Sequence, residues 1–268
     1  MKGDSLPHKV CDIIYLMELE ALHNVWEKEH VLESDSFFKV EILDRRIKKD
    51  FYQRDGIIDL NEYKKVKFKV LFVSNEANIA KYVDELKDDD GCVKTDCRID
   101  YRTYFETGID DWKGKMRERI TALYMFLTKQ HGSIHLFANK FAYMDLNKRG
   151  GTSLSKDCSH IKNYCLHFKN RIIEEIECIN PDIIIWVGVN SFDCGIPELL
   201  GAIIDGGKKY IKIKNKKVPI LRMWHTSFRY SCGLEPINEF RDIRIGRLCA
   251  KLQTEIDRYN IKINEKGV

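Results

Sequence analysis

Runs with strand-like and helix-like character alternate along most of this 268-residue chain, and this alternation constrains the fold more than any other feature. Strand-like runs occur at 66–73, 134–138, 141–146, 182–188, 209–213 and 218–223. Stretches with helical spacing lie between or after them, at 113–130, 160–178 and 236–258. Such alternation predicts a mainly parallel sheet covered by helices. We therefore predict an α/β fold, a three-layer α/β/α sandwich around a short parallel-rich sheet.

The first part of the chain has a different pattern. Residues 8–50 are predicted to be largely helical, because apolar side chains from Ile13 to Trp26 recur at spacings that line one broad face. We predict an N-terminal helical extension over residues 1–65 and an α/β domain over residues 66–268.

Two element boundaries have local causes. Asn180 precedes Pro181, and a residue before proline is driven out of the helical region, so a helix is expected to end there. Gly206 and Gly207 predict a tight turn in a hairpin that continues through the lysine-rich stretch 208–217.

Charge and hydropathy narrow the class of protein. Lys and Arg outnumber Asp and Glu by 45 to 41, a balance that permits a polyanionic partner without requiring one. The start of the chain lacks a secretory apolar core, and the apolar run 183–189 is too short to cross a bilayer. We therefore predict a cytoplasmic protein that does not act in a membrane. No glycine-rich dinucleotide or phosphate-binding motif follows a strand, so we predict no cofactor.

The nine cysteines are odd in number and irregular in spacing, which disfavours a disulfide framework in an intracellular chain. We expect most of them to be reduced and structural. Cys92 with Cys97 and Cys158 with Cys165 are the closest pairs, but neither has the two-residue gap typical of a zinc knuckle. We predict that the chain holds no metal.

Two polar segments each follow an apolar run. Residues 74–78, Ser-Asn-Glu-Ala-Asn, follow 70–73, and residues 224–228, Trp-His-Thr-Ser-Phe, follow 218–221. Reactive groups collect at the carboxyl ends of strands in α/β folds, so a carboxylate and an imidazole from these segments are expected to face one ligand.

These segments resemble motifs of the uracil-DNA glycosylase superfamily. Residues 70–78 resemble its first motif, an apolar strand followed by Gly-Gln-Asp-Pro-Tyr, and His225-Thr226-Ser227 resembles its second, His-Pro-Ser. Between them, 141–148 resembles the strand that reads the base edge, and 181–188 resembles the buried strand before the second motif. The resemblance covers about residues 66–255 and implies a uracil-DNA-glycosylase-like fold.

The resemblance implies hydrolysis of an N-glycosidic bond in DNA, which leaves an abasic site. That reaction develops positive charge on the sugar and negative charge on the departing base. Glu76 is then expected to align or deprotonate water, and His225 to donate a hydrogen bond to the base. The resemblance also places Asn75 in the base pocket. Tyr104 or Phe105, in the aromatic stretch 101–105, is expected to stack on the flipped base.

Two departures from the family pattern bear on the substrate. Asn78 stands where uracil-specific members carry a tyrosine beside carbon 5, and Asp145 stands where an asparagine reads uracil. An ionised aspartate only accepts hydrogen bonds, and cytosine presents an amino donor. We therefore expect a cytosine with a bulky 5-substituent, as in hypermodified viral DNA, and a role in anti-phage defence. A register shifted by two residues would place Asn147 there and restore uracil.

The segment after His225 is expected to contact the DNA. Extrusion of a nucleotide leaves a gap in the base stack. Ser227 and Arg229 are expected to bind phosphates, and Phe228 or Tyr230 to fill the gap.

Two other classes of function remain open from the residues. The scaffold could bind nucleic acid without cleaving it, because Glu76 is one methylene longer than the family's aspartate and could misplace the water. Alternatively, the protein could act on free nucleosides or nucleotides, which the modest net charge mildly favours. Protein partners and oligomeric state are not indicated by the sequence.

Overall fold

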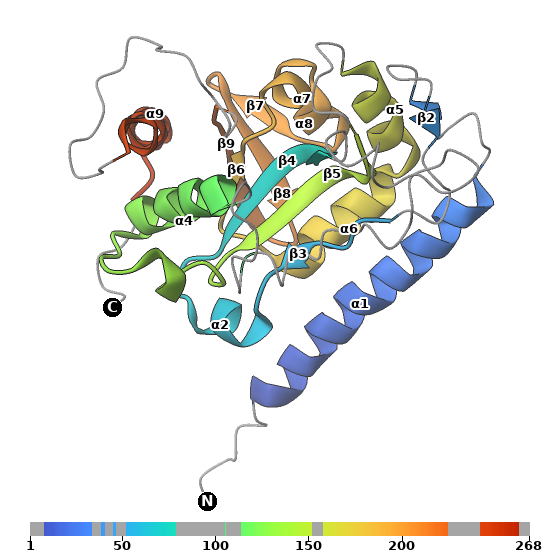
Figure 1. The fold of residues 1–268 in the computed structure, drawn as a ribbon, viewed down its shortest axis with the longest axis horizontal. Coiled ribbons are helices and arrows are strands. Elements are labelled where there is room, and N and C mark those ends of the chain that lie inside the picture. The colour runs from blue at the N-terminus through green and yellow to red at the C-terminus, as the bar shows by residue number, and fades with distance from the viewer. Residues whose placement is uncertain are drawn as a thin grey trace, which may run out of the picture.

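A seven-stranded mixed sheet forms the centre of the computed structural model (Figure 1). The structure describes residues 8–33, 39–40, 45–46, 52–78, 105, 114–151, 158–224 and 242–262. The strands are β3 (Gly56–Ile57), β4 (Val70–Asn78), β5 (Ala142–Gly151), β6 (Ile183–Trp186), β7 (Ile203–Asp205), β8 (Lys208–Ile213) and β9 (Lys216–Arg222), in the spatial order β3-β5-β4-β6-β9-β8-β7.

The four central strands, β5, β4, β6 and β9, are parallel, whereas β3, β8 and β7 join at the two sides in antiparallel pairing. All four residues of β6, Ile183 to Trp186, are buried, as expected for a strand covered on both faces. The predicted parallel-rich sheet is confirmed.

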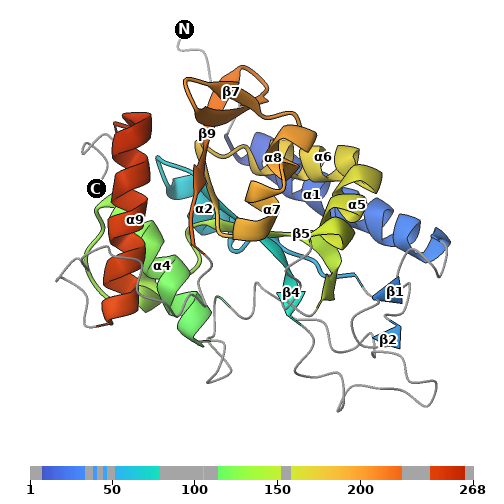
Figure 2. The same ribbon diagram turned by 90° about the horizontal axis from the view of Figure 1, so that it is seen from above.

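Helices cover both faces of this sheet. The helices are α1 (His8–Leu32), α2 (Leu60–Lys65), α4 (Gly114–Thr128), α5 (Ser159–His167), α6 (Lys169–Ile179), α7 (Val189–Asp193), α8 (Ile196–Leu199) and α9 (Ile243–Tyr259). Figure 2 shows α4 and α9 on one side of the sheet and α1, α5 and α6 on the other. Each side has its own apolar core: Phe72, Leu123 and Leu252 belong to the first, and Trp26 and Ile176 to the second.

The sheet begins earlier in the chain than the predicted domain boundary. β3 lies within residues 1–65, yet it pairs antiparallel with Ala142 and Tyr143 of β5. The helical expectation for 8–50 is confirmed over α1, but β1 (Lys39–Val40) and β2 (Arg45–Arg46) form a small antiparallel pair. Two-residue strands carry no periodicity that the sequence could reveal.

Most predicted elements match the structure, with two differences. The expected strand at 134–138 is wrong, because Ile134–Leu136 forms a 3₁₀ helix, η5. The expected helix over 160–178 is two helices, which meet at Phe168. Short apolar runs fit either a strand or a buried helical turn, so periodicity alone does not separate them.

Both predicted boundaries hold. Asn180 ends α6 in the left-handed conformation, with φ of 50°. Gly206 and Gly207, with φ of 56° and 75°, form the tight turn between β7 and β8, a conformation that favours glycine at both positions. None of the helices in the described part of the chain combines the length and apolar character needed to cross a bilayer.

Candidate active site at the strand ends

The parallel pairing of β4 and β5 brings two of the predicted motif segments side by side. The register pairs Ser74 with Asp145 and Glu76 with Asn147, beyond the level of Val73, where the neighbouring strand β6 ends at Trp186. We call these four residues the strand-end cluster. The register shifts beyond Glu76, so that Asn78 lies opposite Gly151. The side chains of Glu76 and Asn78 lie outside what the structure describes.

Asp145 is fully buried and contacts Tyr143 and Asp55. The Tyr143 hydroxyl donates to its Oδ1 at 3.2 Å, and its own backbone N–H donates to Asp55 Oδ2 at 2.7 Å. Burial raises the pKa of Tyr143 well above its usual value and the negative charge of Asp145 raises it further, whereas a hydrogen bond with Ser74 opposes the rise. Tyr143 therefore stays protonated and can keep donating to the carboxylate.

Asn147 lies two residues further along β5 and is 1% exposed. Its Oδ1 accepts hydrogen bonds from the backbone N–H of Arg149 at 3.2 Å and from Arg149 Nε at 3.3 Å. Arg149 also stacks over the Tyr164 ring, with 5.5 Å between its guanidinium carbon and the ring centroid. The oxygen of the Asn147 amide is thus engaged within the protein.

Phe105 lies beside Tyr143, on the face of the sheet covered by α4. Its ring is fully buried, with centroids 5.2 Å from Phe141 in an edge-to-face arrangement and 5.4 Å from Tyr143. Its carbonyl oxygen accepts a hydrogen bond from Arg117 Nε at 2.6 Å. The structure therefore brings Phe105 close to the strand-end cluster, as a ring packed between other aromatic rings.

Asn75 contacts a different part of the fold. Its amide oxygen occupies the space that a Cβ atom on Gly188 would need, at the junction of β6 and α7. The structure therefore places Asn75 against β6 and not against Asp145.

The second motif follows β9. Met223 donates its backbone N–H to Trp186 at 2.9 Å, which extends the pairing of β9 with β6, and Trp224 packs against the apolar core. His225, Ser227, Phe228, Arg229 and Tyr230 lie outside the described residues. His225 nevertheless follows directly on Trp224, so the chain reaches it from the carboxyl end of a central parallel strand.

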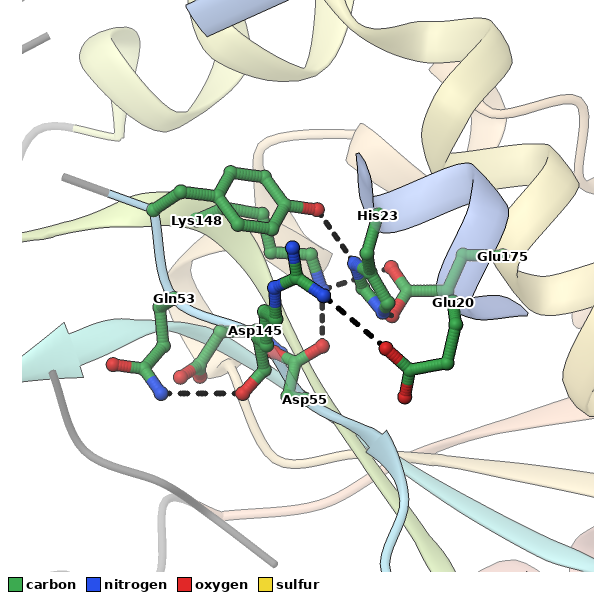
Figure 3. A network of polar contacts seen from close by, with 9 residues as sticks. Glu20, His23, Gln53, Asp55, Asp145, Lys148 and Glu175 are labelled. Carbon is green, nitrogen blue, oxygen red and sulfur yellow. Dashed lines mark hydrogen bonds and ion pairs between the residues drawn. The ribbon is translucent and has the colours of Figure 1, made fainter. Parts of the chain in front are cut away.

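A buried ionic network lies behind β5 (Figure 3). Lys148 pairs with Asp55 and, at 2.8 Å, with Glu175, and all three side chains are fully buried. His23 Nε2 lies 3.5 Å from Glu175 Oε1, and His23 Nδ1 lies 2.6 Å from the Tyr52 hydroxyl oxygen.

Burial alone would lower the pKa of Lys148, but its two acidic partners outweigh burial and raise it. Burial raises the pKa of Glu175 well above its usual value; Lys148 opposes this rise and Asp55 adds to it. The raised pKa of Glu175 favours its protonated form, which reduces the negative charge that the buried network must accommodate.

The same network offers metal-ligating atoms, because His23, Asp55 and Glu175 bring one ligand atom each within 4.8 Å of one another. The Lys148 ammonium, however, contacts both carboxyl groups. A divalent cation there would meet a positive charge at contact distance. The residues present therefore fit a lysine-centred ionic network and do not fit a metal.

The structure pairs two of the cysteines. Cys158, just before α5, forms a disulfide with Cys194, at the end of α7. Cys158 and Cys194 are therefore exceptions to the expectation that most of the cysteines are reduced, and 36 residues separate them in sequence. Cys165 is a buried free thiol, and Cys92 and Cys97 lie outside the described residues.

An open cavity of about 310 Å³ lies away from the sheet, between α1, α5 and α6. Arg171 spans it, paired with Glu29 at 2.6 Å and with Glu174 at 2.7 Å. His167 pairs with Glu33 at its rim. Internal ion pairs thus account for its charged groups, and it contains none of the predicted site residues.

Comparisons of the chain with protein-family models and with curated protein sequences found no match. The candidate site therefore rests on the sequence pattern and on the geometry of the strand ends.

Sequence reasoning missed three residues that contact the candidate site: Tyr143, Gly188 and Asp55. Tyr143 was predictable as a strand residue, and its position two before Asp145 places it on the same face of β5. The contact of Gly188 with Asn75 joins two strands, and that of Asp55 with Asp145 spans 90 residues. No local pattern reveals either contact.

Proposed function

We propose that the protein is a DNA glycosylase that hydrolyses the N-glycosidic bond of a flipped nucleotide, as a divergent member of the uracil-DNA glycosylase superfamily. The observation that carries the proposal is the register of β4 on β5, which sets Glu76 opposite Asn147 and Ser74 opposite Asp145. The segments that resemble the water-activating motif and the base-reading strand are thus neighbours on two adjacent parallel strands.

The position of β9 supports the same proposal. In the strand order, β6 separates β4 from β9, and neighbouring strands lie about 4.8 Å apart, so the axes of β4 and β9 are separated by roughly 10 Å where Val73 and Arg222 both align with Trp186. This distance accommodates a nucleoside. A base held there would have Glu76 on one side and His225 on the other.

In the proposed reaction, water attacks the sugar carbon that carries the base, and the bond from that carbon to the base nitrogen breaks. The Glu76 carboxylate aligns the water and accepts its proton, and its charge stabilises the positive charge that develops on the sugar. His225 donates a hydrogen bond to the departing base, whose negative charge is thereby stabilised. A proton-transferring group of this kind contributes about 10² to 10⁴ in rate.

The favoured substrate is a cytosine with a bulky 5-substituent. Asp145, an acceptor when ionised, matches the cytosine amino group, and Tyr143 holds its other oxygen. Asn78 is smaller than the tyrosine that excludes such substituents in uracil-specific members. Such bases occur in viral DNA, so the proposed role is removal of hypermodified bases in anti-phage defence.

A second candidate, a uracil-DNA glycosylase of base-excision repair, is favoured by the position of Asn147. Asn147 lies opposite Glu76 in the register, and it is two residues nearer to the carboxyl end of β5 than Asp145. An asparagine amide both donates and accepts, as uracil requires.

Contacts with the DNA are assigned to the segment after His225. Ser227 and Arg229 bind phosphates, and Phe228 or Tyr230 fills the gap left by the flipped base.

The test is abasic-site formation on matched oligonucleotides that contain uracil, cytosine, 5-hydroxymethylcytosine or its glucosylated form. Cleavage confined to the bulky cytosines, abolished by Glu76→Gln with DNA binding retained, supports the first candidate. Cleavage of uracil supports the second. Binding without any abasic product assigns the scaffold a non-catalytic role in nucleic-acid binding. Turnover of free nucleosides with no dependence on DNA would overturn the assignment of DNA as substrate.

A further inference from the structure

The outer edge of β5 is held by a side chain where strand pairing stops. β3 pairs only with Ala142 and Tyr143. Beyond that point the Asp55 carboxylate accepts the backbone N–H of Asp145 at 2.7 Å, and the backbone N–H of Gln53 donates to the carbonyl of Lys148 at 2.6 Å. A carboxylate therefore replaces the backbone acceptor that a longer β3 would have supplied to Asp145.

The same carboxylate is fixed from its other oxygen. Asp55 Oδ1 accepts from the buried Lys148 ammonium, and Lys148 also pairs with Glu175 of α6 and lies 5.3 Å from the centroid of the Trp26 ring of α1. Figure 3 shows Asp55, Lys148 and Glu175 converging from the segment before β3, β5 and α6, with His23 of α1 beside them. Asp55 thus contacts β5 twice, at Asp145 and at Lys148, on the two sides of the segment that carries Asn147.

A buried ion pair of this kind need not add net stability, because desolvation of the charges offsets their attraction. Its geometric effect is more specific. Two charge-assisted contacts from one carboxylate fix the position of a strand segment more closely than a single backbone hydrogen bond does. Both candidate base-reading residues, Asp145 and Asn147, belong to that segment.

We propose that Asp55 is a positioning residue for base recognition, which anchors the Asp145–Asn147 segment of β5 through the Asp145 backbone and through Lys148. This inference rests on the proposed function for its catalytic consequence, although the anchoring itself does not. A displacement of about 1 Å at a reacting centre can cost 10²-fold in rate. The segment before β3, within the predicted N-terminal extension, thereby forms part of the machinery that selects the base.

The test compares Asp55→Asn with Asp55→Ala. Asparagine keeps an oxygen that can accept the Asp145 N–H, and alanine removes it. Tyr63→Phe is the matched control, because it deletes another buried hydrogen bond, from Tyr63 of α2 to the Ile179 carbonyl at the end of α6 at 3.3 Å. Each variant is measured in the full-length protein for amide hydrogen exchange at Asp145, kcat, KM and selectivity among the four oligonucleotides.

Asp55→Ala is expected to speed amide hydrogen exchange at Asp145 at least 10-fold. It is also expected to lower kcat about 10²-fold with KM little changed, and to reduce the discrimination between the four oligonucleotides. Asp55→Asn should retain the protection of the Asp145 amide against exchange and most of the wild-type kcat. Tyr63→Phe should leave both quantities at their wild-type values. If the Asp145 amide exchanged at the wild-type rate in the Asp55→Ala variant, the proposed anchoring would be wrong. Faster exchange with wild-type kcat and selectivity would overturn the positioning role. A wild-type protein inactive on every oligonucleotide would instead refute the proposed function, while the exchange measurement would still decide the anchoring.

Discussion

The side-chain amide of Asn75 and the backbone of Gly188 share one space at the carboxyl ends of β4 and β6: the amide oxygen stands where a Cβ atom on residue 188 would be. Gly188 has φ of −85°, a conformation open to any residue, so glycine is required there by the contact and not by the backbone. The close approach of these two residues fixes the spacing between the ends of β4 and β6.

Gly188→Ala should therefore destabilise the protein by about 1–3 kcal/mol, because the added methyl group meets the Asn75 oxygen and also Ser191 Oγ, at 2.8 Å. Denaturant unfolding measures this cost. Asn75→Ala in the same background should recover part of it, with a coupling energy of about 0.5–3 kcal/mol in a double-mutant cycle. Additive effects of the two substitutions would show that they do not share the space.

Glu175→Gln should weaken the pH dependence of stability. The pKa of buried Glu175 is raised above its unfolded value of about 4.3, so the folded state holds this proton to higher pH than the unfolded state. Its contribution to stability is complete below about pH 4.3 and is lost as pH rises toward the folded pKa, by up to about 1.4 kcal/mol per unit. Glutamine mimics the protonated acid, so the variant should lose less stability between pH 5 and 8.

Thermal unfolding from pH 5 to 8 checks this expectation. Glu174→Gln is a suitable control, since Glu174 lies on the same helix but pairs with Arg171 at the surface. Parallel curves for wild type and Glu175→Gln would contradict a raised pKa of Glu175 in the folded state.

Removal of the Cys158–Cys194 disulfide should lower the free energy of unfolding by about 3–4 kcal/mol. The bond closes a loop with a sequence separation of 36, and the chain-entropy model gives this magnitude for such a loop. Denaturant unfolding of wild type with and without reductant, beside a Cys158→Ser, Cys194→Ser double variant, measures it. The double variant should be indifferent to reductant; equal stability of all samples would argue against the bond.

Substitutions that convert the acid at position 145 to an amide, or the amide at position 147 to an acid, should change which base is excised. Asp145→Asn should move selectivity toward uracil by about 10- to 100-fold if Asp145 reads the base, because an amide both donates and accepts. Asn147→Asp should instead move selectivity toward cytosine if Asn147 is the reader. Rates of abasic-site formation on paired uracil and cytosine oligonucleotides separate the two cases. Unchanged selectivity in both variants would exclude β5 from base recognition.

The long elements of the fold were predictable because each carries its own periodicity. The α9 helix presents Leu248, Leu252, Ile256 and Tyr259 at helical spacing, and all four are buried. The β6 strand is a run of buried apolar residues before a turn. The strand at 134–138 failed because so short a run fits a helical turn equally well, and β3 was missed because two residues carry no pattern.

The candidate site was predictable only in part. Motif order suggested that 74–78 and 145–147 meet, and the parallel register of β4 on β5 agrees with that expectation. The partners of Asp145 were not predictable, because Asp55 reaches it across 90 residues of sequence. Contacts of that separation depend on the whole topology, which local propensity does not encode.

The buried face of α1 has a consequence for synthesis of the chain on the ribosome. His30 contacts Tyr164, 134 residues later in the sequence, at 2.5 Å, and the Trp26 ring packs on the same tyrosine, with 6.4 Å between the centroids. At about 5–20 residues per second, α1 emerges roughly 7–27 s before this partner. Throughout that interval the apolar face of the first helix has no native surface to cover it, so the nascent chain is most exposed to aggregation before α5 and α6 have been made.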